Sequence, residues 1–272
     1  MSLSPKHPIS FALDERVARV TINRPHKCNA MDAATWRALA AIAGSLSARG
    51  ARALQISGAG EDFSAGADLD ELRALLPRPS EQLANAQLVQ QVLKLLENQA
   101  LPSVALVRGA CVDSGLGLAL CCDMRLAAPD ARFAFTSVRL GLHSSLADTR
   151  RLAGVIGLAR AREMLLTART IDAETALDWG LVNRVVEPSD DLQAAGDELT
   201  RDWARTLPSG LAATRRVMAA LDGSRPLSEE ILDRQFLEAF SGDDFRAGAK
   251  AELEQCEPDT ADACKEDQDN GT

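Results

Sequence analysis

Short apolar runs alternate with longer segments of helical periodicity along most of the chain. Residues 16–22 alternate apolar and polar side chains, which predicts a strand with one covered face. Residues 53–57 and 104–107 are short and almost wholly apolar, which predicts buried strands. Each of these two is followed by a loop of small residues and then by apolar side chains at helical spacing. The pattern therefore predicts the α/β class.

The same periodicities place the remaining elements. Further strands are expected at residues 123–128, 132–135 and 181–186. Asp32 is expected to cap a helix containing Trp36, and Asp172 a helix that ends at Gly180. The other expected helices are 69–76, 81–98, 116–122, 146–166 with interruptions near Gly154 and Gly157, 191–205, 211–221 and 228–240.

Two loops follow buried strands and carry almost no side chains. Residues 58–68 include three glycines and three alanines, and Asp68 then opens a helix. Such a loop lets backbone N–H groups approach a ligand closely, and a helix start adds unpaired N–H groups. An ordinary strand-to-helix turn is the alternative. Residues 108–115 form a second small-residue loop before a buried helix. Two loops of this kind can supply two N–H donors to one oxyanion.

Composition limits the classes of protein and partner. A chain of 272 residues can form one large core with a small appendage. The net charge of -9 argues against a nucleic-acid partner. No apolar run reaches the length of a membrane span and residues 1–10 lack a signal-peptide core, so a cytoplasmic protein without a membrane partner is expected. Eight acids against Lys265 in residues 252–272 predict a disordered acidic tail.

Few side chains are available for metal binding or proton transfer. The six cysteines show no zinc-ligand spacing, so reduced thiols and no metal site are expected. The chain has three histidines and no tyrosine, which narrows the choice of general bases. Arg24, His26 and Lys27 cluster in the loop after the first strand. That cluster is either a solvated turn or a phosphate-binding edge.

Taken in order, several segments resemble the enoyl-CoA hydratase/isomerase (crotonase) superfamily. The segments are Asn23-Arg24-Pro25 with Asn29-Ala30-Met31, residues 63–69, residues 109–123, Leu140-Gly141-Leu142 and residues 173–186. The resemblance runs from about residue 9 to residue 250. It implies a spiral core of ββα units over residues 1–200, a helical region over 201–255 and the acidic tail over 256–272. It also implies a homotrimer or hexamer, and an acyl-CoA substrate with coenzyme A as part of the substrate and no separate cofactor.

The resemblance also implies roles for particular residues. The backbone N–H groups of Ala67 and Ser114 would hold the thioester oxygen as it gains negative charge. Relatives usually have glycines where this chain has Asp113-Ser114-Gly115, and the side chains could change the loop or crowd the acyl pocket. The coenzyme A ester would lie along both loops, against Arg24, Lys27, Cys28, Ala30, Ala65, Ala67, Asp68, Leu69 and Ser114.

The chain departs from the family at the proton-transfer positions. Members that hydrate enoyl-CoA use two glutamates, and the aligned residues are Gly117 and Ser137, which argues against simple hydration. The aspartate of isomerase and dehalogenase relatives aligns with Ser145.

Three other residues could replace the missing acid and base. They are Asp113, His143 and Asp148, for which an exposed loop carboxylate, a solvated histidine and a helix cap or salt bridge are the plain alternatives. Isomerisation, thioester cleavage and dehalogenation-type chemistry stay open. So do a catalytically inactive CoA-ester-binding or scaffold protein and a purely structural oligomer partner.

Overall fold

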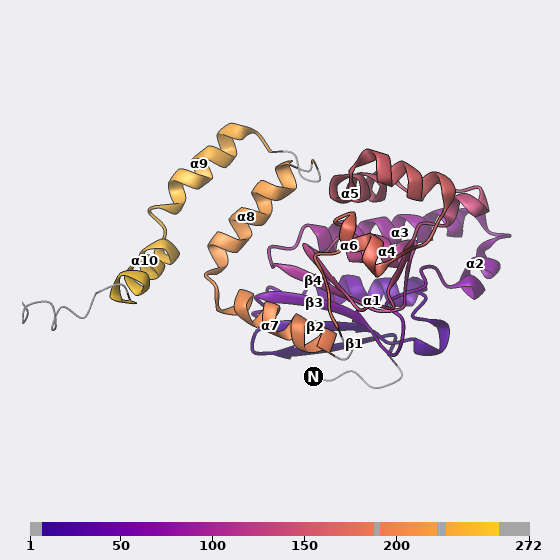
Figure 1. The fold of residues 1–272 in the computed structure, drawn as a ribbon, viewed down its shortest axis with the longest axis horizontal. Coiled ribbons are helices and arrows are strands. Elements are labelled where there is room, and N and C mark those ends of the chain that lie inside the picture. The colour runs from indigo at the N-terminus through magenta and orange to yellow at the C-terminus, as the bar shows by residue number, and fades with distance from the viewer. Residues whose placement is uncertain (1–6, 188–190, 222, 224–226, 256–272) are drawn as a thin grey trace, which may run out of the picture. The chain divides into compact units, whose positions relative to one another are not determined.

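The computed structural model describes residues 7–187, 191–221, 223 and 227–255 (Figure 1). The chain divides into two compact units, Met1–Pro226 and Leu227–Thr272. The first unit thus continues past residue 200, where the sequence predicts the core to end. The predicted acidic tail, residues 256–272, lies outside the described residues.

Two sheets form the centre of the first unit. The larger has the order β1-β2-β3-β4-β6-β9, in which only the β1–β2 pair is antiparallel. The smaller has the order β5-β7-β8. The larger sheet consists of β1 (Ile9–Asp14), β2 (Val17–Ile22), β3 (Ala53–Gly58), β4 (Ser103–Val107), β6 (Met124–Ala127) and β9 (Arg184–Val185). The smaller consists of β5 (Ala110–Val112), β7 (Arg132–Ala134) and β8 (Ile171–Asp172).

Helices connect the parallel strands, as crossovers between parallel strands require. In the first unit they are α1 (Ala33–Ala43), α2 (Leu69–Leu75), α3 (Pro79–Glu97), α4 (Ser114–Leu120), α5 (Leu146–Thr167), α6 (Ala173–Asp178), α7 (Asp191–Arg205) and α8 (Pro208–Leu221). Short 3-10 turns, η1 (Pro25–Lys27) and η2 (Ser137–Leu140), lie beside the two small-residue loops. The second unit contains α9 (Glu229–Ala239) and α10 (Asp243–Gln255).

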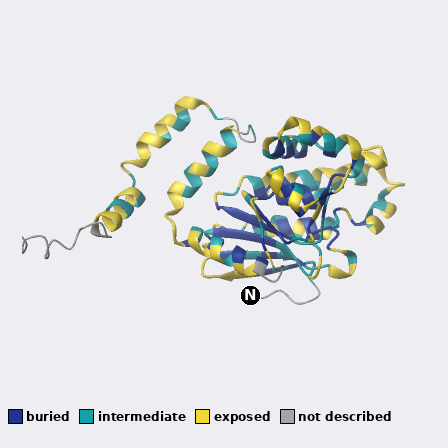
Figure 2. Ribbon diagram, in the orientation of Figure 1, coloured by how far each residue is buried: buried dark blue, intermediate teal, exposed yellow. Residues whose placement is uncertain are grey.

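The larger sheet is covered on both faces. All five residues of β4 are buried, and successive side chains point to opposite faces. Val104 and Leu106 pack in a cluster with Leu192 of α7, whereas Ala105 and Val107 belong to the main core with α1 and α4. Figure 2 shows the strands buried and the outer surfaces of the helices exposed. The continuous apolar run at residues 104–107 is explained by this burial.

Helix α4 is the buried element that positions the second loop. Every residue from Gly115 to Leu120 is buried. A helix that is apolar all round fits only in a core. Its first residue, Ser114, is therefore fixed at the end of the second loop by the packing of the rest of the helix.

The α/β fold with a C-terminal helical region confirms the sequence-based expectation. Both predicted caps are confirmed, since Asp32 accepts a hydrogen bond from Thr35 N and Asp172 accepts one from Thr175 N. The interruption of α5 is confirmed at Gly157 alone, where the backbone has φ 78°. Strand β1 was not predicted from the sequence, and β5 forms at residues 110–112, where a loop was expected.

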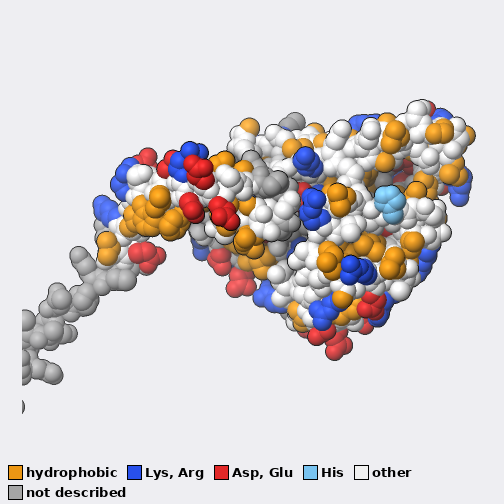
Figure 3. All heavy atoms as spheres, turned by 90° about the horizontal axis from the view of Figure 1, so that it is seen from above, with side chains coloured by type: hydrophobic (Ala, Val, Ile, Leu, Met, Phe, Trp, Pro, Cys, Tyr) orange, Lys and Arg blue, Asp and Glu red, His pale blue; other side chains and the backbone are white. Residues whose placement is uncertain are grey.

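The second unit carries large apolar side chains on its surface. Phe236, Leu237, Phe240 and Phe245 are all exposed, and Phe240 stacks edge to face with both of the other phenylalanines. Figure 3 shows hydrophobic side chains gathered on these C-terminal helices. None of the helices in the described ranges is both long and apolar enough to cross a membrane.

Candidate active site

The two small-residue loops lie against each other, backbone to backbone. Ser64 N donates to Ala110 O over 2.8 Å, and Val112 N donates to Ser64 O over 2.9 Å. A Cβ on Gly115 would lie 2.6 Å from Ser64 O, so only glycine allows this approach. The ends of both loops are thereby held at one place, as the sequence predicts.

Ala67 presents its N–H away from its own loop. A parallel bridge joins Met31 to Ala67, in which Met31 N donates to Gly66 O and Asp68 N donates to Met31 O. In a parallel bridge of this kind, the N–H of the bridged residue, here Ala67, points away from the partner segment that contains Met31. No acceptor for Ala67 N occurs within the described part of the chain, and the residue is exposed. This N–H is available to a ligand.

Ser114 supplies the second candidate N–H. It is the first residue of α4, and the first N–H groups of a helix have no partner within the helix. Its hydroxyl is also buried without a hydrogen-bond partner among the described residues. The preceding Asp113 has φ 47° and ψ -116°, an uncommon backbone for a residue other than glycine.

The carboxylate of Asp113 is used to hold a neighbouring turn. It accepts hydrogen bonds from Thr136 N at 2.6 Å and Ser137 N at 3.1 Å, and also from the Thr136 hydroxyl. This side chain ties the second loop to η2, which contains Ser137. With three donors already in place, the structure gives Asp113 an anchoring position.

His143 lies on an exposed loop. Its Nδ1 is 2.9 Å from Ser144 O, and its ring makes no other hydrogen bond among the residues that the structure describes. Apart from this contact with the neighbouring backbone, His143 is exposed to solvent, which agrees with the alternative interpretation of a solvated histidine.

Asp148 is the candidate that the fold brings next to a family proton-transfer position. A Cβ on Gly117 would lie 3.1 Å from Asp148 Oδ1 and 3.5 Å from Leu93 Cδ1. The side chain of Asp148 therefore occupies the space that a side chain at position 117 would enter. A carboxylate therefore lies beside position 117, although it comes from α5 and α4 has none there.

The Asp148 carboxylate is held by three donors. Ser145 Oγ donates to Oδ2 over 2.6 Å, Gln90 Nε2 donates to the same oxygen over 3.1 Å, and Arg151 pairs with Oδ1 at 2.9 Å. Arg151 in turn makes a two-point ion pair with Glu97, at 2.7 and 2.8 Å. Burial is the largest single effect and lowers the pKa of Arg151, but the hydrogen bond to Glu97 and the nearby negative charges of Glu97 and Asp148 together raise this pKa overall. The expected salt bridge of Asp148 is confirmed.

The predicted coenzyme A residues also come together, on the other side of the first loop. Ala65 N donates to Cys28 O over 2.9 Å, which joins this loop to residues 24–30. Asp68 accepts from Arg24 at 2.6 Å and from Lys27 at 2.9 Å, and it caps α2 through Asp70 N.

The charge state of Asp68 follows from these partners. Burial alone would raise the pKa of Asp68, but the bonds from Lys27 and Arg24 lower it to about 2. Lys27 donates hydrogen bonds to Asp70 as well as to Asp68, and both bonds raise the pKa of Lys27. Arg24 also pairs with Asp32 and donates to Ala30 O. The cations of the predicted phosphate edge are thus matched by carboxylates in this structure, and Leu69 beside them is exposed.

Sequence reasoning missed the partners that orient Asp148. Gln90 and Glu97 lie on α3 and are more than 50 positions from it in the chain. One local signal was present, because Ser145 and Asp148 have the spacing of a capping box. The structure confirms this cap, since Asp148 N donates to Ser145 Oγ over 3.0 Å.

The fold and the paired loops define a crotonase-like protein, a class supported by solved structures of the same fold. An enoyl-CoA hydratase/isomerase family protein from Hyphomonas neptunium superposes with a TM-score of 0.88 at 29% identity, over 93% of this chain and 97% of that one. An enoyl-CoA hydratase homologue from Thermobifida fusca YX, solved in complex with CoA, gives 0.76 at 30% identity, over 94% and 99%.

The sequence comparisons identify the family. The enoyl-CoA hydratase/isomerase family model matches residues 13–263, and the chain belongs to this family. The short-chain-enoyl-CoA hydratase of Clostridium acetobutylicum is 32% identical over 247 residues, which is 88% of this chain and 92% of the relative.

Proposed function

We propose that the protein binds acyl-CoA thioesters and moves a proton on the acyl group, with Asp148 as the general base. The observation that carries the proposal is the 3.1 Å between Asp148 Oδ1 and the Cβ position of Gly117. Family members that hydrate enoyl-CoA have a glutamate at that position. Here α5 supplies a carboxylate to the same space.

Ala67 and Ser114 would stabilise the charge that this proton transfer creates. When the α-proton leaves, its bonding electron pair moves toward the thioester and the carbonyl oxygen becomes an oxyanion. The free N–H groups of the two residues suit that oxygen. Removing one donor of this kind typically raises the barrier by about 2.7–4 kcal/mol.

A double-bond isomerisation fits a single proton carrier best. On a 3-enoyl thioester, Asp148 would take the proton from the α carbon and return it to the γ carbon. The double bond then moves to the α,β position with no net gain or loss of atoms. Hydration needs a second group to activate water, and the second glutamate position is Ser137, whose hydroxyl cannot take that role unassisted.

The orientation of Asp148 supports the role of base. Its three contacts, from Ser145, Gln90 and Arg151, are all donors, so the carboxylate acts as an acceptor. The same contacts restrict the side chain, and a restricted base is better placed for proton transfer.

Proton exchange in D2O tests the proposal directly. Purified protein is incubated with a 3-enoyl-CoA and a saturated acyl-CoA, and mass spectrometry follows both double-bond migration and uptake of deuterium at the α carbon. We expect Asp148→Asn to lower both rates by about 100-fold or more, because a positioned base contributes at least that much. Asp130→Asn, a substitution of an exposed loop residue, is the matched control.

The absence of both proton-transfer glutamates favours a second candidate function, a catalytically inactive protein that only binds CoA esters. Binding of the esters with neither migration nor exchange in the wild-type protein would establish it. If the reaction proceeds and Asp148→Asn leaves both rates unchanged, the assignment of the base is wrong.

A further inference from the structure

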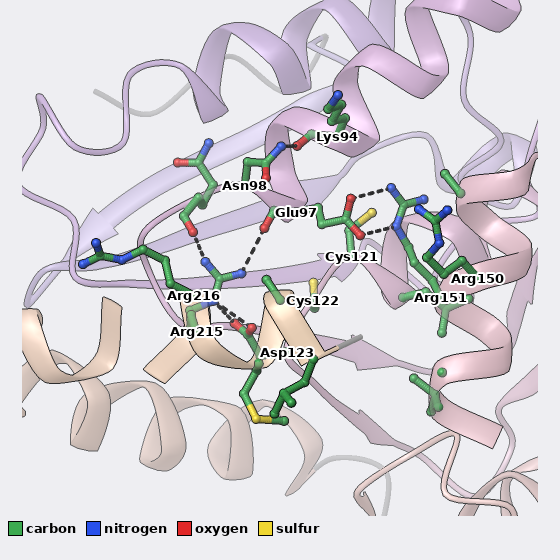
Figure 4. A pocket seen from close by; sticks show the side chains of 18 of the residues that line it. Lys94, Glu97, Asn98, Cys121, Cys122, Asp123, Arg150, Arg151, Arg215 and Arg216 are labelled. Carbon is green, nitrogen blue, oxygen red and sulfur yellow. Dashed lines mark hydrogen bonds and ion pairs between the residues drawn. The ribbon is translucent and has the colours of Figure 1, made fainter. Parts of the chain in front are cut away.

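A large cavity lies in the first unit, away from Ala67 and Ser114. It has a volume of about 1130 Å³, and neither of those residues lines it. Its walls come from α3, the C-terminal end of α4, α5 and α8. Figure 4 shows charged side chains from these elements directed into it. The volume is ample for a small-molecule ligand.

The lining of the cavity has an excess of positive charge. Six cations line it, against the two carboxylates of Glu97 and Asp123, so the cavity has a formal charge of +4 in a chain of -9. The cations are Lys94, Arg125, Arg150, Arg151, Arg215 and Arg216. This concentration opposes the overall charge and indicates an anionic ligand.

The two carboxylates are already matched by arginines. Arg151 pairs with Glu97 at 2.7 Å, and Arg215 pairs with Asp123 at 2.7 Å (Figure 4). Each acid therefore neutralises one guanidinium.

Three of the remaining cations have no acidic partner. Arg125 is buried and donates to backbone carbonyls, including Leu181 O at 2.6 Å and Cys122 O at 2.8 Å. Lys94 and Arg150 are exposed side chains on facing helices α3 and α5. Among the described residues, no ion pair includes Lys94, Arg125 or Arg150. Lys94 and Arg150 are thus available to bind an anion.

The apolar part of the lining restricts the ligand further. Leu120, Val155, Met218 and Leu221 are aliphatic or thioether side chains, and the last two, on α8, are exposed. None of the described residues that line the cavity is aromatic. A nucleotide would find no ring on which to stack its base. An aliphatic chain, in contrast, would cover apolar surface that is now in contact with water.

We propose that this cavity is a binding site for an aliphatic carboxylate; Ala67 and Ser114 do not line it, although Gln90 and Arg151, which hold Asp148, do. Lys94 and Arg150 bind the carboxylate on the side formed by α3 and α5, and Met218 and Leu221 of α8 cover the chain. Tight binding requires both the negative charge and the aliphatic chain of the ligand. A short anion and an uncharged aliphatic molecule each bind poorly. It does not depend on the proposed acyl-CoA chemistry.

Titration calorimetry with decanoate, below its micelle concentration and at low salt, tests the proposal on the full-length protein. We expect saturable binding of decanoate, and at least tenfold weaker binding of acetate and of decan-1-ol. The double variant Lys94→Gln/Arg150→Gln is expected to weaken decanoate binding at least tenfold. Both residues are exposed, so the variant should fold. Arg162→Gln, an exposed arginine of the same helix α5 outside the cavity, is the matched control and should bind as the wild type does.

A second variant tests the apolar half of the site. Met218→Asp puts a negative charge beside the proposed chain and should also weaken binding at least tenfold. The proposal is overturned if decanoate does not bind, if decan-1-ol binds equally well, or if either cavity variant binds decanoate as tightly as the control.

Discussion

Arg151 is the residue on which the buried charges around Asp148 depend. Its side chain is only 7% exposed, and it pairs with Glu97 on one side and Asp148 on the other. Both carboxylates are nearly buried as well. Without the guanidinium, two negative charges would stay inside the protein with no cation between them.

Arg151→Met is therefore expected to lower the free energy of unfolding by about 3–5 kcal/mol, the usual cost of breaking a buried ion pair. The comparison variant is Arg73→Met, whose partner Asp70 lies on the surface, with side chains 79% and 68% exposed. Removing that pair should cost less than about 1 kcal/mol. Urea denaturation of both variants gives the two values. Equal losses would mean that the Glu97–Arg151–Asp148 contacts add no more to stability than the surface pair does.

Asp68 should make stability depend on pH in the acid range. Its pKa in the folded protein is about 2, below the value of about 3.9 for an aspartate in an unfolded chain. The lowered pKa contributes stability that is complete above about pH 4 to 5 and disappears as the pH falls toward 2, with a full size of about 2 kcal/mol.

The measurement is the difference in unfolding free energy between wild type and Asp68→Asn. We expect this difference to stay constant from pH 6 to about pH 5 and then to shrink as the pH falls to 3. A constant difference over that range would show that the ion pairs with Arg24 and Lys27 do not set the charge of Asp68.

At the scale of single elements, α5 contains two glycines in different backbone conformations, one helical and one not. Gly157 has φ 78°, a backbone that other residues rarely adopt, whereas Gly154 lies in the regular part of the helix. A Cβ at either position would meet nothing within 4 Å. The effect on stability of adding a side chain at either position therefore depends on the backbone conformation alone.

Gly154→Ala should raise the melting temperature, since alanine in a helix interior is about 1 kcal/mol more favourable than glycine. Gly157→Ala should lower it, because φ 78° with ψ 157° is a conformation essentially restricted to glycine and costs alanine about 1–3 kcal/mol. Differential scanning calorimetry distinguishes the two directions. A stabilised Gly157→Ala variant would mean that α5 can run straight through this position.

Local signals account for what the sequence could predict about elements. The caps at Asp32 and Asp172 depend on residues three positions apart, and the buried strands on runs of four or five residues. Strand β1 was missed because its turn to β2 consists of Glu15 and Arg16, both with positive φ. Such a turn normally contains asparagine, aspartate or glycine, so these residues gave no signal.

The site was only partly predictable for the same reason. Ala67 and Ser114 could be predicted as N–H donors because short motifs mark both loops, and their role stays a prediction. The proximity of Asp148 and Gly117 is a tertiary contact between two helices, 31 positions apart in the chain, and no pattern in the sequence encodes it. The ion pair between Arg151 and Glu97 spans 54 positions and was equally hidden.

At the scale of the whole molecule, the exposed phenylalanines of the C-terminal unit indicate a surface that binds another protein subunit. Phe236, Phe240 and Phe245 form a contiguous aromatic group, and such groups on soluble proteins mark interaction sites. A homotrimer or hexamer, as the family resemblance implies, would cover them.

We expect analytical ultracentrifugation to give a trimer or hexamer for the wild type and a smaller species for Phe236→Ser/Phe240→Ser. Leu83→Ser, a substitution of an exposed leucine on α3, is the control and should keep the wild-type assembly. A monomeric wild-type protein, or a double variant that assembles normally, would exclude this role for the aromatic group.

The contact between Gly117 and Asp148 also bears on how such a site could change during evolution. The two positions share one space, so a side chain at 117 and the aspartate at 148 compete for it. A carboxylate could pass from one helix to the other through a paired exchange, glutamate for glycine on α4 and glycine for aspartate on α5. Either change alone would give crowding or an empty space. The ancestry of the proposed base would thus depend on two linked substitutions, with the surrounding fold unchanged.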